Sequence, residues 1–185
     1  MEALMQPTFD QLQAGLEHIR QSPKNEGALE MIVRRPRTGE REVLGEGHID
    51  LASGLVGDNW LERIQAKRQA GPLDTGAQLT IMNSRAALLV ARSKERWHLA
   101  GDQLIVDLDL SAGNTPPGTQ LAIGPVILEV SAEPHTGCKK FVEHYGMAAM
   151  EFVNSPTGRD LNLRGVNARV VQPGLIRVGD RIRKL

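Results

Sequence analysis

Short β-strand segments recur along most of this 185-residue chain, and they restrict its fold more than any other feature. Apolar and β-branched residues gather in brief runs that alternate with polar residues or stop at glycine and proline, as strands and their turns do. Such runs occupy residues 29–34, 41–46, 78–82, 104–110, 120–123, 126–130, 168–171, 175–178 and 181–183. Many short strands and few long helices predict a mainly β fold, a closed β-barrel with a few short peripheral helices.

Helical patterns are confined to a few places around these strands. Thr8 and Gln11 have the spacing of a capping box, apolar residues follow at helical intervals, and Ser22-Pro23 stops the pattern. Further helices are expected over 84–96, 141–145 and 147–153. We therefore expect an N-terminal helical extension over residues 1–27, acting as a packing lid or a dimer contact. Residues 28–185 should form one β-barrel domain.

The composition excludes several classes of function. Lysine plus arginine number 22 and aspartate plus glutamate number 22, so the formal net charge is zero. That balance argues against a nucleic-acid partner and against a polybasic membrane-surface protein. The N-terminus lacks the pattern of a signal peptide, and the longest apolar run is too short to span a bilayer. The single cysteine cannot form an internal disulfide, so we expect a cytoplasmic protein.

That cysteine lies in the most chemically informative stretch of the chain, residues 133–141. Cys138 follows His135 by three residues and directly precedes Lys139 and Lys140. It lies between an expected strand and an expected helix, where unpaired amides and the helix dipole favour an anion such as a thiolate. The polar neighbours favour a reactive or metal-ligating cysteine over the alternative, a small buried apolar residue.

Four fragments, taken in order, resemble the MOSC domain, which is named for the C-terminus of molybdenum-cofactor sulfurases. They are the corner at 54–58, Gly101-Asp102-Gln103-Leu104, the loop from His135 to Cys138, and the pattern from Arg164 to Asp180. The resemblance covers about residues 28 to 184. It implies a β-barrel that binds a molybdopterin-type molybdenum cofactor or carries sulfur destined for one.

The resemblance gives Cys138 two alternative roles. In family members that are reductases the cysteine ligates molybdenum, and in sulfurases it can accept a persulfide. A thiolate suits both roles, so its chemistry does not separate them. The pyridoxal-phosphate domain of the sulfurases is not expected in this chain, and neither an iron–sulfur nor a dinucleotide motif is present in the sequence. An electron-donor or sulfur-donor protein would therefore be required as a partner.

A molybdopterin ends in a phosphate, so its site needs cations and neutral donors. The expected cations are Lys139, Lys140, Arg159, Arg164 and Arg169, and the expected neutral donors are Asn154, Ser155 and Asn167. Because neighbouring helical residues point about 100° apart, at most one of the two lysines should face the cofactor.

His135 has two alternative interpretations: it sets the protonation of Cys138 or donates to a metal-bound oxygen, or it merely bonds a loop carbonyl. Zinc-ligand spacing is absent from the sequence, and no local signature of a cysteine hydrolase surrounds Cys138.

The sequence does not distinguish between three functions. The first is a molybdenum-dependent reductase of N-hydroxylated small-molecule substrates, with Cys138 as the molybdenum ligand. The second is a sulfur carrier that uses a Cys138 persulfide for the assembly of metal–sulfur cofactors. The third is a non-catalytic barrel that binds a small anion or a protein. A homodimer is compatible with all three.

Overall fold

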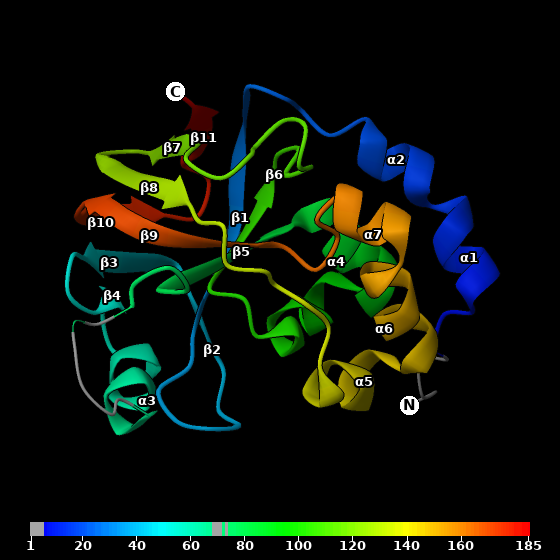
Figure 1. The fold of residues 1–185 in the computed structure, drawn as a ribbon, viewed down its shortest axis with the longest axis horizontal. Helices are drawn as coiled ribbons and strands as arrows, with labels where there is room; N and C mark the ends of the chain where they lie inside the picture. Colours follow the sequence, from blue (N-terminus) through cyan, green and yellow to red (C-terminus); the bar gives the residue numbers. More distant parts are fainter. Residues whose placement is uncertain (1–5, 68–71, 73) are drawn as a thin grey trace.

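One long strand, β1 (Glu26–Arg34), closes the barrel. The computed structural model describes residues 6–67, 72 and 74–185. Within them β1 pairs with β11 (Arg181–Lys184) on one side and with β6 (Leu104–Asp107) on the other. The ring between these two neighbours is completed, in order from β11, by β7 (Gln120–Ile123), β8 (Val126–Val130), β9 (Val166–Gln172) and β5 (Leu79–Asn83). The expected closed barrel with short peripheral helices is confirmed (Figure 1).

Because β1 is long, it belongs both to the barrel and to a hairpin that extends beyond it. Its first residues pair with β11, and its last three, ending at Arg34, pair with β2 (Glu42–Leu44). A β-bulge between Leu29 and Met31 shifts the register against β6, and bulges increase the local twist of a strand. The end of β1 therefore leaves the barrel as a hairpin with β2.

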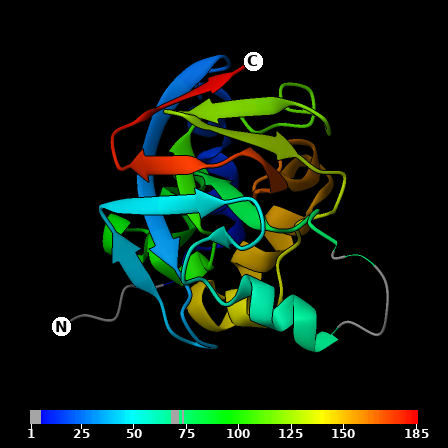
Figure 2. The same cartoon turned by 90° about the vertical axis from the view of Figure 1, so that its left-hand side faces the viewer.

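A second, three-stranded sheet contributes to the core of the barrel. Its order is β10 (Gly174–Arg177), β3 (Glu46–Asp50) and β4 (Gly54–Leu55), and all its pairings are antiparallel. Figure 2 shows β3 and β10 side by side, with α3 (Trp60–Lys67) below them. Ile49, Leu55 and Ile176 from this sheet belong to the same buried cluster as the inward-facing residues of the barrel strands.

The remaining helices gather on one side of the barrel, the right-hand side of Figure 1. Outward-facing barrel residues such as Met31, Met82 and Ile105 pack with buried helical residues in a second apolar cluster. Because strand side chains alternate between faces, the barrel wall can supply both clusters. These elements are α1 (Phe9–Ala14), α2 (Leu16–Arg20), α4 (Ser84–Ala91), the 3₁₀-helix η1 (Lys94–Ala100), α5 (Lys139–Tyr145), α6 (Met147–Asn154) and α7 (Pro156–Asp160).

Several local expectations need correction. The N-terminal pattern forms two short helices that meet at Gly15, although the expected capping box of Thr8 and Gln11 is present. The helix expected over 84–96 ends at Ala91, because Arg92 adopts a left-handed conformation with φ of 66°. Ser155 caps α7, where the polar residues predicted only a loop.

Two further observations complete the fold. The helix α3 was not predicted. The sequence predicts a surface loop over residues 67–72, and these residues lie largely outside the described part of the chain. None of the helices in the described part of the chain is long and apolar enough to cross a membrane.

Barrel closure at β1 depends on a glycine. A Cβ atom at Gly27 would lie 1.7 Å from the backbone oxygen of Asp107, so alanine there must push the β1 and β6 backbones apart. We expect Gly27→Ala to lower the free energy of unfolding by roughly 2–4 kcal/mol, measured by urea denaturation. Gly45→Ala is the matched control, because its Cβ meets nothing within 4 Å. Equal stabilities of the two variants would contradict this account of closure.

Candidate functional site: a cationic cavity beside Cys138

A cluster of chemically active residues lines a cavity of about 370 Å³ on the outer face of the barrel. Its floor contains Thr80 on β5 and Asn167 on β9, which are paired across the two antiparallel strands. Both side chains point away from the barrel interior, where their strand neighbours Ile81 and Ala168 lie. The volume falls within the range of small-molecule sites, about 300–1,000 Å³.

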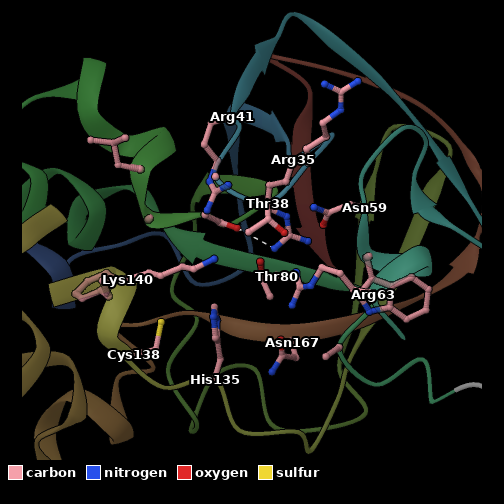
Figure 3. A pocket seen from close by; sticks show the side chains of 18 of the residues that line it. Arg35, Thr38, Arg41, Asn59, Arg63, Thr80, His135, Cys138, Lys140 and Asn167 are labelled. Carbon is pink, nitrogen blue, oxygen red and sulfur yellow. Dashed lines mark hydrogen bonds between the residues drawn. The ribbon is translucent and has the colours of Figure 1, made fainter. Parts of the chain in front are cut away.

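Four parts of the chain form the walls. They are the β1–β2 hairpin, α3, the end of η1 with Gly101, and the cysteine loop with the first turn of α5. In Figure 3, Cys138, His135 and Lys140 lie on one side of the cavity, and Asn59 and Arg63 lie on the opposite side. Segments distant in sequence therefore meet at one site.

The cavity is strongly basic. Seven lysine and arginine side chains line it, and none of its lining residues in the described part of the chain is aspartate or glutamate. Low-dielectric walls that carry one sign of charge focus the electric field and concentrate counter-ions. The cavity therefore favours an anion. The seven cations are Arg35, Arg37, Arg41, Arg63, Lys67, Lys140 and Arg164.

Two of these arginines are fixed by buried carboxylates behind the wall. Arg35 donates from Nε and Nη2 to the two oxygens of Asp58, at 2.8 Å each, and from Nη1 to the Gly101 carbonyl. Asp58 also accepts bonds from the backbone amides of Arg35 and Trp60. One carboxylate thus ties β1 to the start of α3.

Arg164 is held in the same way from another direction. Its Nη1 donates to Asp102 Oδ2 at 2.5 Å, its Nη2 donates to the Ala100 carbonyl, and its guanidinium lies 5.0 Å from the centroid of the Phe141 ring. The Arg164 side chain is 7% exposed and that of Asp102 is fully buried. Charge-assisted, buried pairs of this kind hold the guanidinium in a fixed orientation.

His135 contacts the same carboxylate. Its Nδ1 lies 3.5 Å from Asp102 Oδ1, and neither atom has a hydrogen-bond partner. Burial lowers the pKa of His135 to about 4, with nearby Arg164 acting in the same direction and Asp102 opposing them. The imidazole is therefore neutral at pH 7, and its contact with Asp102 is not an ion pair.

Cys138 is exposed and lies at the N-cap of α5, after the loop that follows β8. The loop is fixed by Asn154, whose side chain accepts a bond from the Gly137 amide at 2.9 Å. A Cβ at Gly137 would lie 3.1 Å from Met150 and Val153, so the loop packs closely on α6. The position predicted for Cys138 between a strand and a helix is confirmed. Figure 3 shows its sulfur beside the cavity, near His135 and Lys140.

Several buried polar atoms around the cavity lack hydrogen-bond partners. They include Arg41 Nε, Asn59 Oδ1, Trp60 Nε1 and Arg164 Nε. Burial and the neighbouring Arg35 lower the pKa of Arg41, as expected for a cation in a basic, partly desolvated site. Unpaired buried polar groups are rare in folded proteins. Along this cavity they leave donors and acceptors that a polar ligand or solvent can satisfy.

The predicted site residues divide into two sets. The structure brings Cys138, His135, Lys140, Arg164 and Asn167 together around the cavity. Five others do not line it: Lys139, Asn154, Ser155, Arg159 and Arg169.

Each residue of the second set has another position or contact. Arg169 pairs with Glu129 on the neighbouring strand, Ser155 caps α7, and Asn154 holds the cysteine loop. Arg159 is exposed on α7, and Lys139 is exposed on α5.

Sequence reasoning missed the cations that come before the cysteine. Arg35, Arg37 and Arg41 belong to the β1–β2 hairpin, where the sequence predicts only a turn over residues 36–39, and Arg63 and Lys67 lie on the unpredicted helix α3. One signal was available: four arginines within residues 34–41 are unusual for a turn between two strands. Their proximity to Cys138 depends on the barrel topology.

A metal site built from protein ligands alone is not found. No group of three or more His, Cys, Asp or Glu residues in the described part of the chain could hold a metal ion.

Comparison with known proteins identifies the family. The MOSC domain family model matches residues 57–183, more than half of the chain. The chain therefore belongs to the MOSC domain family, as the fragments in its sequence suggested. No curated protein matches the chain.

Solved structures share the fold at low sequence identity. The YuaD protein from Bacillus subtilis matches with a TM-score of 0.65 and 15% identity, over 85% of this chain and 94% of the other. YiiM from Escherichia coli matches with a TM-score of 0.55 and 20% identity, over 85% of this chain and 69% of the other. At these identities the likeness concerns the fold.

The neutral, buried His135 generates a pH prediction. Its pKa rises from about 4 in the folded state to about 6.5 in the unfolded chain, so unfolding takes up a proton between these values. The stability that His135 contributes is complete above pH 6.5 and is lost as the pH falls toward 4. Between pH 7 and pH 5 we expect the wild type to lose about 2 kcal/mol more of its free energy of unfolding than His135→Gln loses. Urea denaturation at the two pH values measures it, and identical pH dependence of the two proteins would contradict it.

Proposed function

We propose that this MOSC domain protein binds a molybdopterin-type cofactor in the cationic cavity and reduces N-hydroxylated compounds. The observation that carries the proposal is the exposed Cys138 sulfur beside a cavity lined by seven cations. A phosphorylated cofactor requires both features, cations for its phosphate and a thiolate for its metal.

The residues present fit such a group. Arg41 and Arg164 each have a buried Nε without a partner, which suits the oxygens of a phosphate or the acceptor atoms of a pterin. Thr80 and Asn167 on the floor add neutral polar groups. Cys138 would hold the molybdenum, and Lys140 would add positive charge beside it. When bound, the cofactor supplies the two-electron chemistry at its metal.

This chain and a partner protein must meet the other requirements of the reaction, which are electrons, protons and polar contacts to the bound molecule. Reduction of an N-hydroxylated compound consumes two electrons and two protons, breaks the N–O bond and releases the reduced nitrogen compound and water. The electrons come from an electron-donor protein. His135, neutral and beside Cys138, is positioned to exchange a hydrogen bond with a bound molecule.

One observation favours a second candidate. Cys138 is exposed and is the single cysteine of the chain, so a persulfide on it could not be resolved into an internal disulfide. A sulfur carrier needs this combination, with sulfur supplied by a donor protein. The third candidate is a non-catalytic barrel, which would bind an anion in the same cavity and catalyse neither reaction.

Metal analysis separates these functions. Protein purified from a host that makes molybdenum cofactor is expected to contain about one molybdenum per chain, and Cys138→Ser is expected to lose it. Lys140→Gln should lower the molybdenum content, whereas the matched control Lys139→Gln, next to it but outside the cavity, should not.

The other outcomes are equally informative. Metal-free protein that releases thiocyanate when treated with cyanide, through Cys138, would favour the sulfur carrier. Protein with neither molybdenum nor labile sulfur would leave the non-catalytic binding role.

A further inference from the structure

Three cations at the open side of the cavity take no part in the buried ion pairs. Arg63 and Lys67 on α3 and Arg37 on the β1–β2 hairpin are exposed lining residues. Arg37 has an acidic neighbour, Glu40, at 3.8 Å, but the two side chains are 82% and 51% exposed. Such an exposed, distant pair contributes little, so Arg37 stays available to a ligand. We call Arg37, Arg63 and Lys67 the mouth cations.

The charge of the cavity exceeds what one phosphate neutralises. Of its seven cations, Arg35 and Arg164 are compensated by Asp58 and Asp102, which leaves five. A phosphate monoester carries about −1.5 to −2 at pH 7. A cofactor with one phosphate would leave a surplus of roughly three positive charges, and like charges confined together repel. A second anion in the same cavity relieves that repulsion.

Two buried residues at the start of α3 provide separate evidence for a ligand. Asn59 is 7% exposed and Trp60 is 4% exposed, yet Asn59 Oδ1 and Trp60 Nε1 have no hydrogen-bond partners. Both residues line the cavity, and Asn59 lies beside Arg63 on the side opposite Cys138 (Figure 3). A buried acceptor and a buried donor without partners cost free energy unless a ligand or solvent completes them. A ligand here would offer one donor, one acceptor and negative charge.

We propose that the mouth cations and the Trp60 Nε1–H donor bind a phosphate or carboxylate group of the substrate, while Asn59 Oδ1 accepts from a donor elsewhere on the same molecule, so that the protein selects anionic over neutral N-hydroxylated molecules. The deep part of the cavity beside Cys138 holds the reacting end, and the mouth holds the anionic end. This inference rests on the proposed reductase for the identity of the reaction. The charge preference itself is a property of the cavity.

A pair of probes that differ by one carboxylate tests the preference. Benzamidoxime and 4-carboxybenzamidoxime are titrated into the purified protein by calorimetry at 50 mM and at 500 mM NaCl. We expect the carboxylated probe to bind at least about tenfold more tightly at low salt, and most of the difference to disappear at high salt. In the double variant Arg63→Gln/Lys67→Gln the two probes should bind alike. Arg20→Gln, an exposed arginine on α2 outside the cavity, is the control and should keep the preference.

Molybdenum content, measured on the same samples, identifies which anion the mouth cations serve. If the double variant keeps its molybdenum but loses the preference for the carboxylated probe, the mouth cations bind the anionic group of the substrate. Loss of molybdenum in that variant would assign these cations to the cofactor phosphate and overturn the inference, as would equal binding of both probes by the wild type. If the wild-type protein contains no molybdenum but keeps the preference, the anionic subsite stands and the proposed reductase fails.

Discussion

Two buried carboxylates make this site possible. Asp58 and Asp102 each fix an arginine of the cavity wall, and each joins parts of the chain that are far apart in sequence: Arg35 to the start of α3, and Arg164 to the end of η1. A guanidinium removed from water without such a partner would cost several kcal/mol. Because the carboxylates lie behind the wall, the arginines are held in place while no acidic side chain of the described residues lines the cavity.

The barrel supplies the geometry and the cysteine loop supplies the reactive atom. Thr80 and Asn167 form a rigid floor because they are paired on adjacent strands, and the long β1 extends past the barrel to carry Arg35, Arg37 and Arg41 over it. The cysteine loop is anchored to α6 through Asn154, so the exposed sulfur has a fixed position relative to the cations. Reactive groups on loops that a rigid scaffold positions are the usual construction of binding and catalytic sites.

Local sequence patterns predicted the fold and the position of Cys138. They could not show which residues from distant parts of the chain line the cavity. Strand runs, the hairpin across Gly124 and the capping residues are encoded within a few residues, so the barrel and the placement of Cys138 could be predicted. Arg159 and Arg169 were favoured because they follow the cysteine in expected loop or strand-start positions. Arg169, however, lies two residues beyond Asn167 on β9, about 7 Å farther along the strand and outside the cavity. The hairpin and α3 cations could not be placed without the barrel topology, because tertiary pairing alone brings them to Cys138.

The central claim is that Cys138 lies in a field of uncompensated positive charge. The most direct test compares the rates at which iodoacetate, an anion, and iodoacetamide, its neutral analogue, alkylate the single thiol. At low salt, the account predicts that the ratio of the iodoacetate rate to the iodoacetamide rate is well above the ratio for a free cysteine derivative. As added salt screens the charges of the cavity, the ratio for Cys138 should fall toward the free value. A ratio equal to that of the free thiol at every salt concentration would contradict it.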